Sequence, residues 1–195
     1  MSRNQLKPSA ERQAATRGAN EPTVAGANTG ATTAAATPAA PALSDLGDLA
    51  EHPLIEVRHS SVHGYGVFAR VDLSSGTFLA FYEGRRYSSR QMSRGNWDDR
   101  VTYLFGLSDG TTIDGAQGGN LTRHLNHACR PNCEATEVDL PRKRLGLRID
   151  TIRPVAVGEE LFLDYALTID DSVDPQTYRC HCGTPECRGH MTGRT

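Results

Sequence analysis

Large hydrophobic residues are distributed unequally along the chain. Between Pro22 and Leu43 the residues are mostly alanine, threonine, glycine and proline, with almost no large apolar side chain. Burial of so little apolar surface cannot offset the loss of backbone entropy on folding. The interspersed glycines and prolines also oppose an alanine helix. We therefore predict a disordered, Ala/Thr/Pro-rich N-terminal tail over residues 1–50.

From Leu54 onward, short apolar runs alternate with turns that contain Gly and Asp. Strands are predicted over Leu54–Arg58, Val67–Ala69, Thr77–Tyr82, Val101–Leu107, Thr111–Asp114 and Leu145–Thr151. Two of these runs have the period-two alternation of half-buried strands, and the best helical signal is Ser88–Met92. The pattern predicts a mostly β fold with short helices, built from several small sheets.

Composition narrows the possible partners and compartments. The formal net charge of −2 gives no global basic field for direct nucleic-acid binding. No apolar run approaches the roughly 20 residues that cross a membrane, and the N-terminus has no apolar signal core. We expect a cytoplasmic or nuclear protein, and delivery into another cell by a secretion system stays open. The oligomeric state is unknown.

The five cysteines all lie between Cys129 and Cys187, which in a reducing compartment favours metal ligands over disulfides. In Cys180-His181-Cys182, the two thiolates can face one tetrahedral ion. Gly183 and Pro185 supply a turn that brings Cys187 round as a third ligand. The fourth ligand must come from elsewhere, and Cys129 and Cys133 are both available.

Three further motifs are weaker when each is taken alone. His63-Gly64-Tyr65-Gly66 is first of all a tight turn between strands. In the polar run around Asn126-His127, amide and imidazole groups could bind a nucleoside-like ligand. His127 could equally be a zinc ligand or a core histidine. Asp164-Tyr165 ends the β-like segment that begins at Glu159.

In this order the four motifs closely resemble the SET domain of protein lysine methyltransferases. Tyr82-Glu83-Gly84 fits that family's Tyr-x-Gly element, and Glu160 to Tyr165 fits its Glu-Leu-x-x-Asp-Tyr element. The resemblance implies a SET-domain fold with a C-terminal pseudoknot over residues 51–166. It also implies a post-SET segment with a zinc knuckle over residues 167–195. His124 and Ala128 stand where the family usually has Phe and Ser.

The resemblance implies methylation of protein lysine ε-amines with S-adenosyl-L-methionine as cofactor. It makes Tyr165 the central catalytic residue and places Tyr82 in the lysine channel. The cofactor-binding residues it implies are His63, Gly64, Tyr65, Gly66, Tyr103, Asn126, His127 and His181. The ligands it implies for a structural Zn²⁺ are Cys129, Cys180, Cys182 and Cys187, which leaves Cys133 spare.

The expected partner is a protein with a basic, lysine-containing tail, such as a histone or a histone-like protein. Acidic residues from Asp164 to Asp174 would steer it, although they could equally be a solvated loop. One alternative is a catalytically weak, zinc-stabilised SET-like module that only binds peptides. Another is a methylated substrate other than a basic tail. Leu163, where these enzymes commonly have Phe or Tyr, leaves the number of transferred methyl groups open.

Overall fold

The computed structural model describes residues 52–95 and 103–193. The tail predicted over residues 1–50, and Val101 of one predicted strand, lie outside the described residues. No helix in the described part of the chain is long and apolar enough to cross a membrane.

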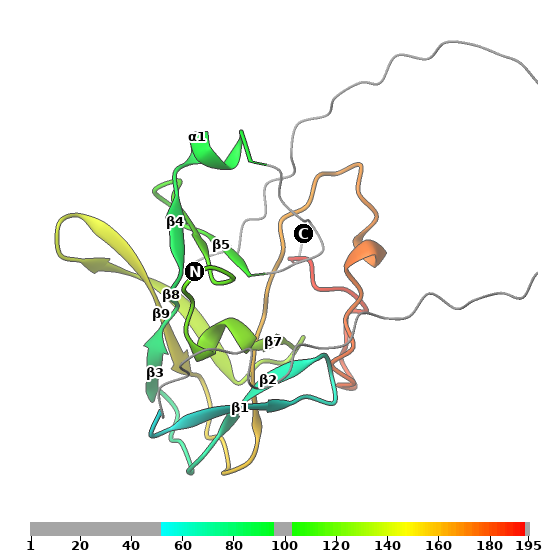
Figure 1. The fold of residues 1–195 in the computed structure, drawn as a ribbon. Helices are drawn as coiled ribbons and strands as arrows, with labels where there is room; N and C mark the ends of the chain where they lie inside the picture. The colour runs from blue at the N-terminus through cyan, green and yellow to red at the C-terminus, as the bar shows by residue number, and fades with distance from the viewer. Residues whose placement is uncertain (1–51, 96–102, 194–195) are drawn as a thin grey trace, which may run out of the picture. The chain divides into compact units, whose positions relative to one another are not determined.

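The described residues form three small sheets with very little helix (Figure 1). The strands are β1 (Ile55–His59), β2 (Tyr65–Ala69), β3 (Phe78–Phe81), β4 (Arg85–Tyr87), β5 (Leu104–Gly106), β6 (Thr112–Asp114), β7 (Asn126–His127), β8 (Cys133–Leu140), β9 (Arg144–Thr151) and β10 (Glu160–Leu163). The helices are α1 (Ser89–Met92) and the 3-10 turns η2 (Leu121–His124) and η3 (Pro175–Tyr178). This confirms the predicted fold class.

The sheet that brings the motifs together has the order β1-β2-β10-β7. β1 and β2 form an antiparallel hairpin, and β10 is antiparallel to β2. β10 is parallel to β7, with Phe162 opposite Asn126 and Leu163 opposite His127. The Asn-His and Asp-Tyr motifs, far apart in sequence, therefore lie side by side.

The other two sheets have the orders β3-β9-β8 and β4-β6-β5. The segment Leu145–Thr151, one of the two runs with period-two alternation, forms β9, and its apolar Leu147 and Ile149 are fully buried. They join one core with residues from all three sheets. Its largest buried side chains include Ile55, Val67, Ile113, Leu147, Ile149, Val155, Leu161 and Leu167.

α1 begins at a capping box, as the predicted helical signal requires. The Ser88 hydroxyl accepts from the Gln91 amide, and the Gln91 side chain accepts from the Ser88 amide. The four-residue helix buries no side chain, so the caps rather than packing set its position.

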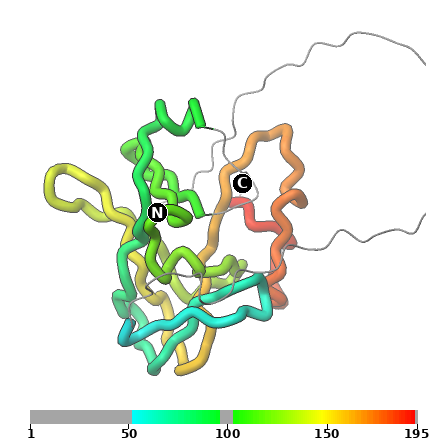
Figure 2. The backbone as a smooth tube through the Cα atoms, viewed as in Figure 1, coloured from blue at the N-terminus to red at the C-terminus, as the bar shows by residue number. Residues whose placement is uncertain are grey.

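After β10 the chain is irregular apart from η3, and it folds back on itself (Figure 2). Leu167 and Thr192 form a parallel bridge, and Arg179 and His190 an antiparallel one. The amide of Leu167 donates to the Met191 carbonyl at 3.0 Å. These few contacts close a loop that carries three of the five cysteines.

Candidate metal centre and active site

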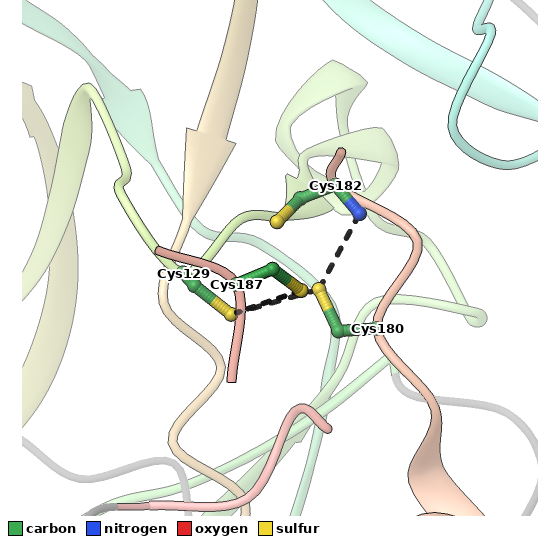
Figure 3. Close-up of side chains that lie close together, drawn as sticks. All are labelled: Cys129, Cys180, Cys182 and Cys187. Atoms are coloured by element: carbon green, nitrogen blue, oxygen red, sulfur yellow. Dashed lines mark hydrogen bonds between the residues drawn. The ribbon is translucent and has the colours of Figure 1, made fainter. Parts of the chain in front are cut away.

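Four cysteines converge from two distant parts of the chain (Figure 3). Cys129 follows β7, and Cys180, Cys182 and Cys187 come from the loop after η3. Their sulfur atoms all lie within 4.8 Å of one another, with Cys129 Sγ 3.6 Å from Cys180 Sγ and 4.0 Å from Cys187 Sγ. Thiolates around a tetrahedral Zn²⁺ at about 2.3 Å lie about 3.8 Å apart. The cluster fits zinc in number, chemistry and spacing.

Cys133 is not part of this cluster. Its side chain is 1 % exposed and packs in the hydrophobic core, and burial raises its pKa to about 12. Of the two candidates for the fourth position, the structure therefore brings Cys129 to the other three.

Backbone amides around the cluster donate to its sulfurs. The amide of Arg188 donates to Cys129 Sγ and that of Gly189 to Cys187 Sγ, both at 3.3 Å. The amide of Cys182 donates to Cys180 Sγ at 3.4 Å. Such bonds stabilise negative charge on sulfur and orient the ligands of a metal.

The Arg188 side chain fastens this loop to the Asp-Tyr motif. Its two terminal nitrogens donate to the two carboxylate oxygens of Asp164, at 2.8 and 2.7 Å. Burial opposes ionisation of Asp164, but Arg188 outweighs it and lowers the pKa of that carboxyl. A paired, two-point contact of this kind fixes orientation as well as distance.

His127 connects the cysteine cluster to Tyr165. Its Nδ1 accepts from the Tyr165 amide at 3.1 Å, so the ring proton sits on Nε2, which lies 3.5 Å from Cys129 Sγ. Burial lowers the pKa of His127 to about 4, which keeps the ring neutral. Neither ring nitrogen is directed away from the protein, so an adenine contact at this residue would have to use other atoms.

Tyr165, whose ring centroid lies 5.4 Å from that of His127, and Tyr82 are two buried tyrosines. Tyr165 Oη donates to the Leu125 carbonyl at 2.7 Å, and Tyr82 Oη donates to the Tyr103 carbonyl at 2.8 Å. Burial and then the proximity of Tyr165 raise the pKa of Tyr82 well above its usual value. Because each hydroxyl has one proton, both oxygens can only accept from any further partner. The pair can orient an amine through its N–H groups.

Asn126 holds the turn between β1 and β2 rather than facing outward. Its amide nitrogen lies 3.2 Å from the His63 carbonyl, 3.0 Å from the Tyr65 carbonyl and 2.9 Å from Glu160 Oε1. Gly64, with φ of 47°, makes the turn. Asn126 therefore positions the residues predicted to bind the cofactor.

Glu160 anchors the same turn from β10. Its Oε2 accepts from the Ser60 hydroxyl at 2.9 Å, and the Ser60 oxygen accepts from the Val62 amide at the same distance. A Cβ on Gly66 would collide with the Glu160 carboxylate, so any larger residue there would displace that carboxylate from its hydrogen bonds. Ser60 was not singled out from sequence, and Glu160 was named only as the first residue of the Glu-Leu-x-x-Asp-Tyr element, because only the fold brings the two together.

The remaining predicted cofactor residues border the turn or the cysteine loop. His63 and His181 are exposed, and Tyr65 is half-buried with its ring centroid 4.6 Å from that of His59. Tyr103 is half-buried, and its carbonyl also accepts from the Gly115 amide at 3.0 Å. Asn132, fully buried, was also missed from sequence: its side chain accepts from the Phe162 amide at 2.7 Å and donates to the Glu160 carbonyl at 2.8 Å.

Several known proteins are similar in sequence to this chain. "Histone-lysine N-methyltransferase trithorax" of Drosophila virilis is 30% identical over 70% of this chain and 4% of its own length. "Histone-lysine N-methyltransferase SETD1A" of Homo sapiens is 32% identical over 68% of this chain and 8% of its own length. "Histone-lysine N-methyltransferase, H3 lysine-36 specific" of Aspergillus oryzae is 33% identical over 74% of this chain and 15% of its own length. The chain thus matches only a small part of each relative.

A solved structure has the same fold. It is described as "ctPRC2 in an autoinhibited conformation bound to S-adenosylmethionine", and it matches 58% of this chain and 15% of its own with a TM-score of 0.51 and 30% identity. The family model described as "SET domain" matches residues 64–166, more than half of the sequence. With its turn, its paired strands and its two tyrosines in that region, this chain belongs to the SET-domain family.

Proposed function

We propose that this chain transfers a methyl group from S-adenosyl-L-methionine to the ε-amine of a protein lysine. The observation that carries the proposal is the pair of buried tyrosines, Tyr165 and Tyr82, whose hydroxyls already donate to backbone carbonyls. When bound, S-adenosylmethionine supplies a methyl group carried on a positively charged sulfur, which a neutral amine can attack.

The two phenol oxygens would accept N–H bonds from the lysine and so aim its lone pair. An exposed lysine has a pKa of about 10.4, and burial in an apolar channel favours the neutral amine that must react. Fixing the amine in an attacking geometry removes much of the entropic barrier. Tyr165 orients the amine, and Tyr82 lines the channel beside Phe105, with the two ring centroids 4.6 Å apart.

Around the cofactor, the turn from His63 to Gly66 would hold the amino-acid end, with Tyr103 beside it. The β7 pair, Asn126 and His127, would border the adenine side, and the exposed His181 would close over it. This assignment rests on the family's motifs and on the hydrogen bonds that fix the turn.

We further propose that residues 51–166 form the catalytic SET domain and that residues 167–195 form a post-SET segment around one structural Zn²⁺. Four thiolates leave a tetrahedral zinc no open position, so the metal would order the loop rather than take part in the reaction.

The proposed substrate is a basic tail of a histone or a histone-like protein. The relatives' names point to histones. Asp171 and Asp174 are exposed beside the cysteine loop and would attract a basic partner, whereas Asp164 is neutralised by Arg188. Raising salt should therefore slow capture of a basic peptide more than turnover at saturation.

The test is Tyr165→Phe, which removes one hydroxyl and keeps the ring. We expect methyl transfer to a lysine-rich peptide panel, read by mass spectrometry with labelled cofactor, to fall by about a hundredfold or more. Cofactor affinity should stay within about threefold, because the ring packing is unchanged.

Tyr87→Phe, on β4, is the matched control and should retain activity. Undiminished transfer by Tyr165→Phe would refute its assigned role. Absence of transfer to every peptide by the native chain, with normal cofactor binding, would favour a peptide-binding module.

A further inference from the structure

A hollow of about 360 Å³ lies between the β8–β9 hairpin and the β4-β6-β5 sheet. Ile113, Leu140 and Leu147 provide its apolar lining. Tyr82 contributes to its wall, but the hydroxyl of that residue is directed to the Tyr103 carbonyl. Figure 1 shows the β8–β9 hairpin projecting away from the C-terminal loop that carries the cysteines. The hollow is thus separate from the metal centre.

Two guanidinium groups, Arg86 and Arg144, and one exposed carboxylate, Glu83, border the hollow, so its charged lining has an excess of one positive charge. Within residues 52–95 and 103–193, neither guanidinium group has a carboxylate at ion-pair distance. Burial, and then the charge of Arg144, lower the pKa of Arg86, while Asp109 opposes this only from a longer distance. A half-buried cation beside a like charge is unfavourable until an anion joins it.

Exposed aromatic surface continues from the hollow along β3. Phe81 lines the hollow and is 36% exposed, and Phe78 beside it is 39% exposed, with ring centroids 5.3 Å apart. β3 is an edge strand of its sheet. Aromatic and arginine side chains are the groups most enriched at the centres of protein interfaces.

We propose that this hollow binds an acidic, apolar peptide segment of a partner protein. A carboxylate of the segment would lie between Arg86 and Arg144, and the adjacent apolar side chain would enter the hollow against Phe81. Guanidinium groups pair with carboxylates through two parallel hydrogen bonds, and the surrounding apolar surface strengthens that contact.

The apolar lining favours a peptide over a nucleic acid. Phosphate contacts are made mainly by solvated basic groups that follow a backbone. Here Arg86 is half-buried beside Ile113 and Leu147, where a leucine-like side chain would remove apolar surface from water. The proposal does not depend on methyl transfer, so either can fail alone.

The experiment titrates the zinc-loaded full chain with the capped peptide Leu-Glu-Leu-Glu and follows backbone amide signals by NMR. We expect saturable shifts at Gly84, Gly118 and Gly146, which line the hollow. The capped peptide Leu-Gln-Leu-Gln should bind about fivefold more weakly or worse, because it lacks the charge.

Arg86→Gln and Arg144→Gln should each weaken binding of the acidic peptide by about fivefold. Arg144 is exposed on the hairpin, so its replacement tests the charge even if Arg86→Gln does not fold. Arg90→Gln, an exposed change on α1, is the matched control and should bind normally.

Equal binding of both peptides would overturn the proposal, as would the absence of shifts at the three glycines up to the solubility limit. A short DNA duplex could instead shift the same signals more strongly than the acidic peptide does. That result would identify the hollow as a nucleic-acid contact and would also overturn the proposal.

Discussion

Glu160 positions the turn that is proposed to bind the cofactor. It is 9% exposed, accepts from Ser60 and Asn126, and leaves no room for a side chain at Gly66. Glu160→Gln preserves shape but loses the charge and places an NH₂ group against existing donors. We expect cofactor affinity, measured by calorimetry, to fall about tenfold, since hydrogen bonds to charged groups contribute about 1.5–3 kcal/mol.

The effect should lie in cofactor affinity, with the maximal rate at saturating cofactor within about threefold of native. Glu56→Gln on β1, a surface carboxylate paired with Arg58, is the control and should change neither quantity. A loss confined to the maximal rate would contradict a positioning role for Glu160.

His124 replaces the phenylalanine usual in this family, and it gives the fold a pH dependence. Burial lowers its pKa from 6.5 to about 4, and Arg123, whose Nε donates to its Nε2 at 3.0 Å, adds to the shift. Above pH 6.5 the ring is neutral in both states. As pH falls from about 6.5 to 4, the unfolded chain binds the proton more readily, so stability is lost in that window.

His124→Phe should remove this loss, on the order of 2 kcal/mol by pH 5.0. Urea unfolding of both proteins at pH 7.5 and 5.0 checks the prediction. The difference between the proteins cancels contributions that they share, such as protonation of the cysteines. An identical pH dependence in the two proteins would show that His124 is not responsible.

The sequence identified the polar motifs but not the direction of their side chains. Asn126 and His127 were expected at the adenine side, yet their side-chain nitrogens contact the turn, Tyr165 and Cys129. Their role at the cofactor stays a prediction. The contacts of Asn126 with the turn and of His127 with Tyr165 join positions tens of residues apart, and a linear pattern carries no information about that pairing.

Strands with alternating or continuous apolar residues could be predicted, as β9 shows. β8 could not, because its eight residues include Glu134, Glu137 and Asp139 and its position depends on pairing with β9 along its full length. β7 is two residues long and exists only through β10. Local propensity decides the first class of strand, and tertiary pairing decides the second.

The turn of the β8–β9 hairpin holds strain that a substitution can release. Arg142 and Lys143 have φ of 64° and 56°, where Asn and Gly are favoured. Arg142→Asn combined with Lys143→Gly should stabilise the domain by about 1 kcal/mol in chemical unfolding. Binding of the acidic peptide should be retained, because Arg86 and Arg144 are unchanged.

A substitution that should destabilise the same hairpin supplies the control. Gly146→Ala would press a Cβ against the Leu140 side chain at 2.8 Å, so it should destabilise the same hairpin by about 1 kcal/mol or more. If the turn variant is no more stable than the native chain, the native basic residues meet no strain there.

At the scale of the described residues as a whole, there is a β core and a C-terminal loop whose order depends on few contacts. Leu167 and Tyr165 belong to the core. The cysteine loop is joined to it through Cys129, the Arg188–Asp164 and Arg130–Glu186 ion pairs, and the Leu167–Thr192 bridge. The zinc site should therefore stabilise the loop and only weakly the core. This division could be expected from the cysteine spacing, but the Arg188 contact could not.

Removal of zinc by a chelator should abolish methyl transfer and expose the loop after Leu167 to proteolysis, while most of the β-sheet signal in circular dichroism remains. Cys187→Ser should reproduce both effects, because three thiolates hold zinc far less tightly. Metal analysis should give one zinc for each native chain, bound by thiolates.

Cys133→Ala and Cys129→Ala separate structural from ligand cysteines. Cys133 is fully buried among apolar residues, so its loss should lower the unfolding free energy by about 1–2 kcal/mol and leave the zinc content unchanged. Cys129→Ala should lose zinc. Cys129 comes from outside the cysteine loop, and its sulfur lies beside those of Cys180 and Cys187. Zinc loss from the Cys133 variant with retention in the Cys129 variant would overturn the assigned ligand set. Retention in both would mean that the loop holds its metal with three cysteines, and the loop would then be tied to the Asp-Tyr motif through the Arg188–Asp164 pair rather than through a metal ligand.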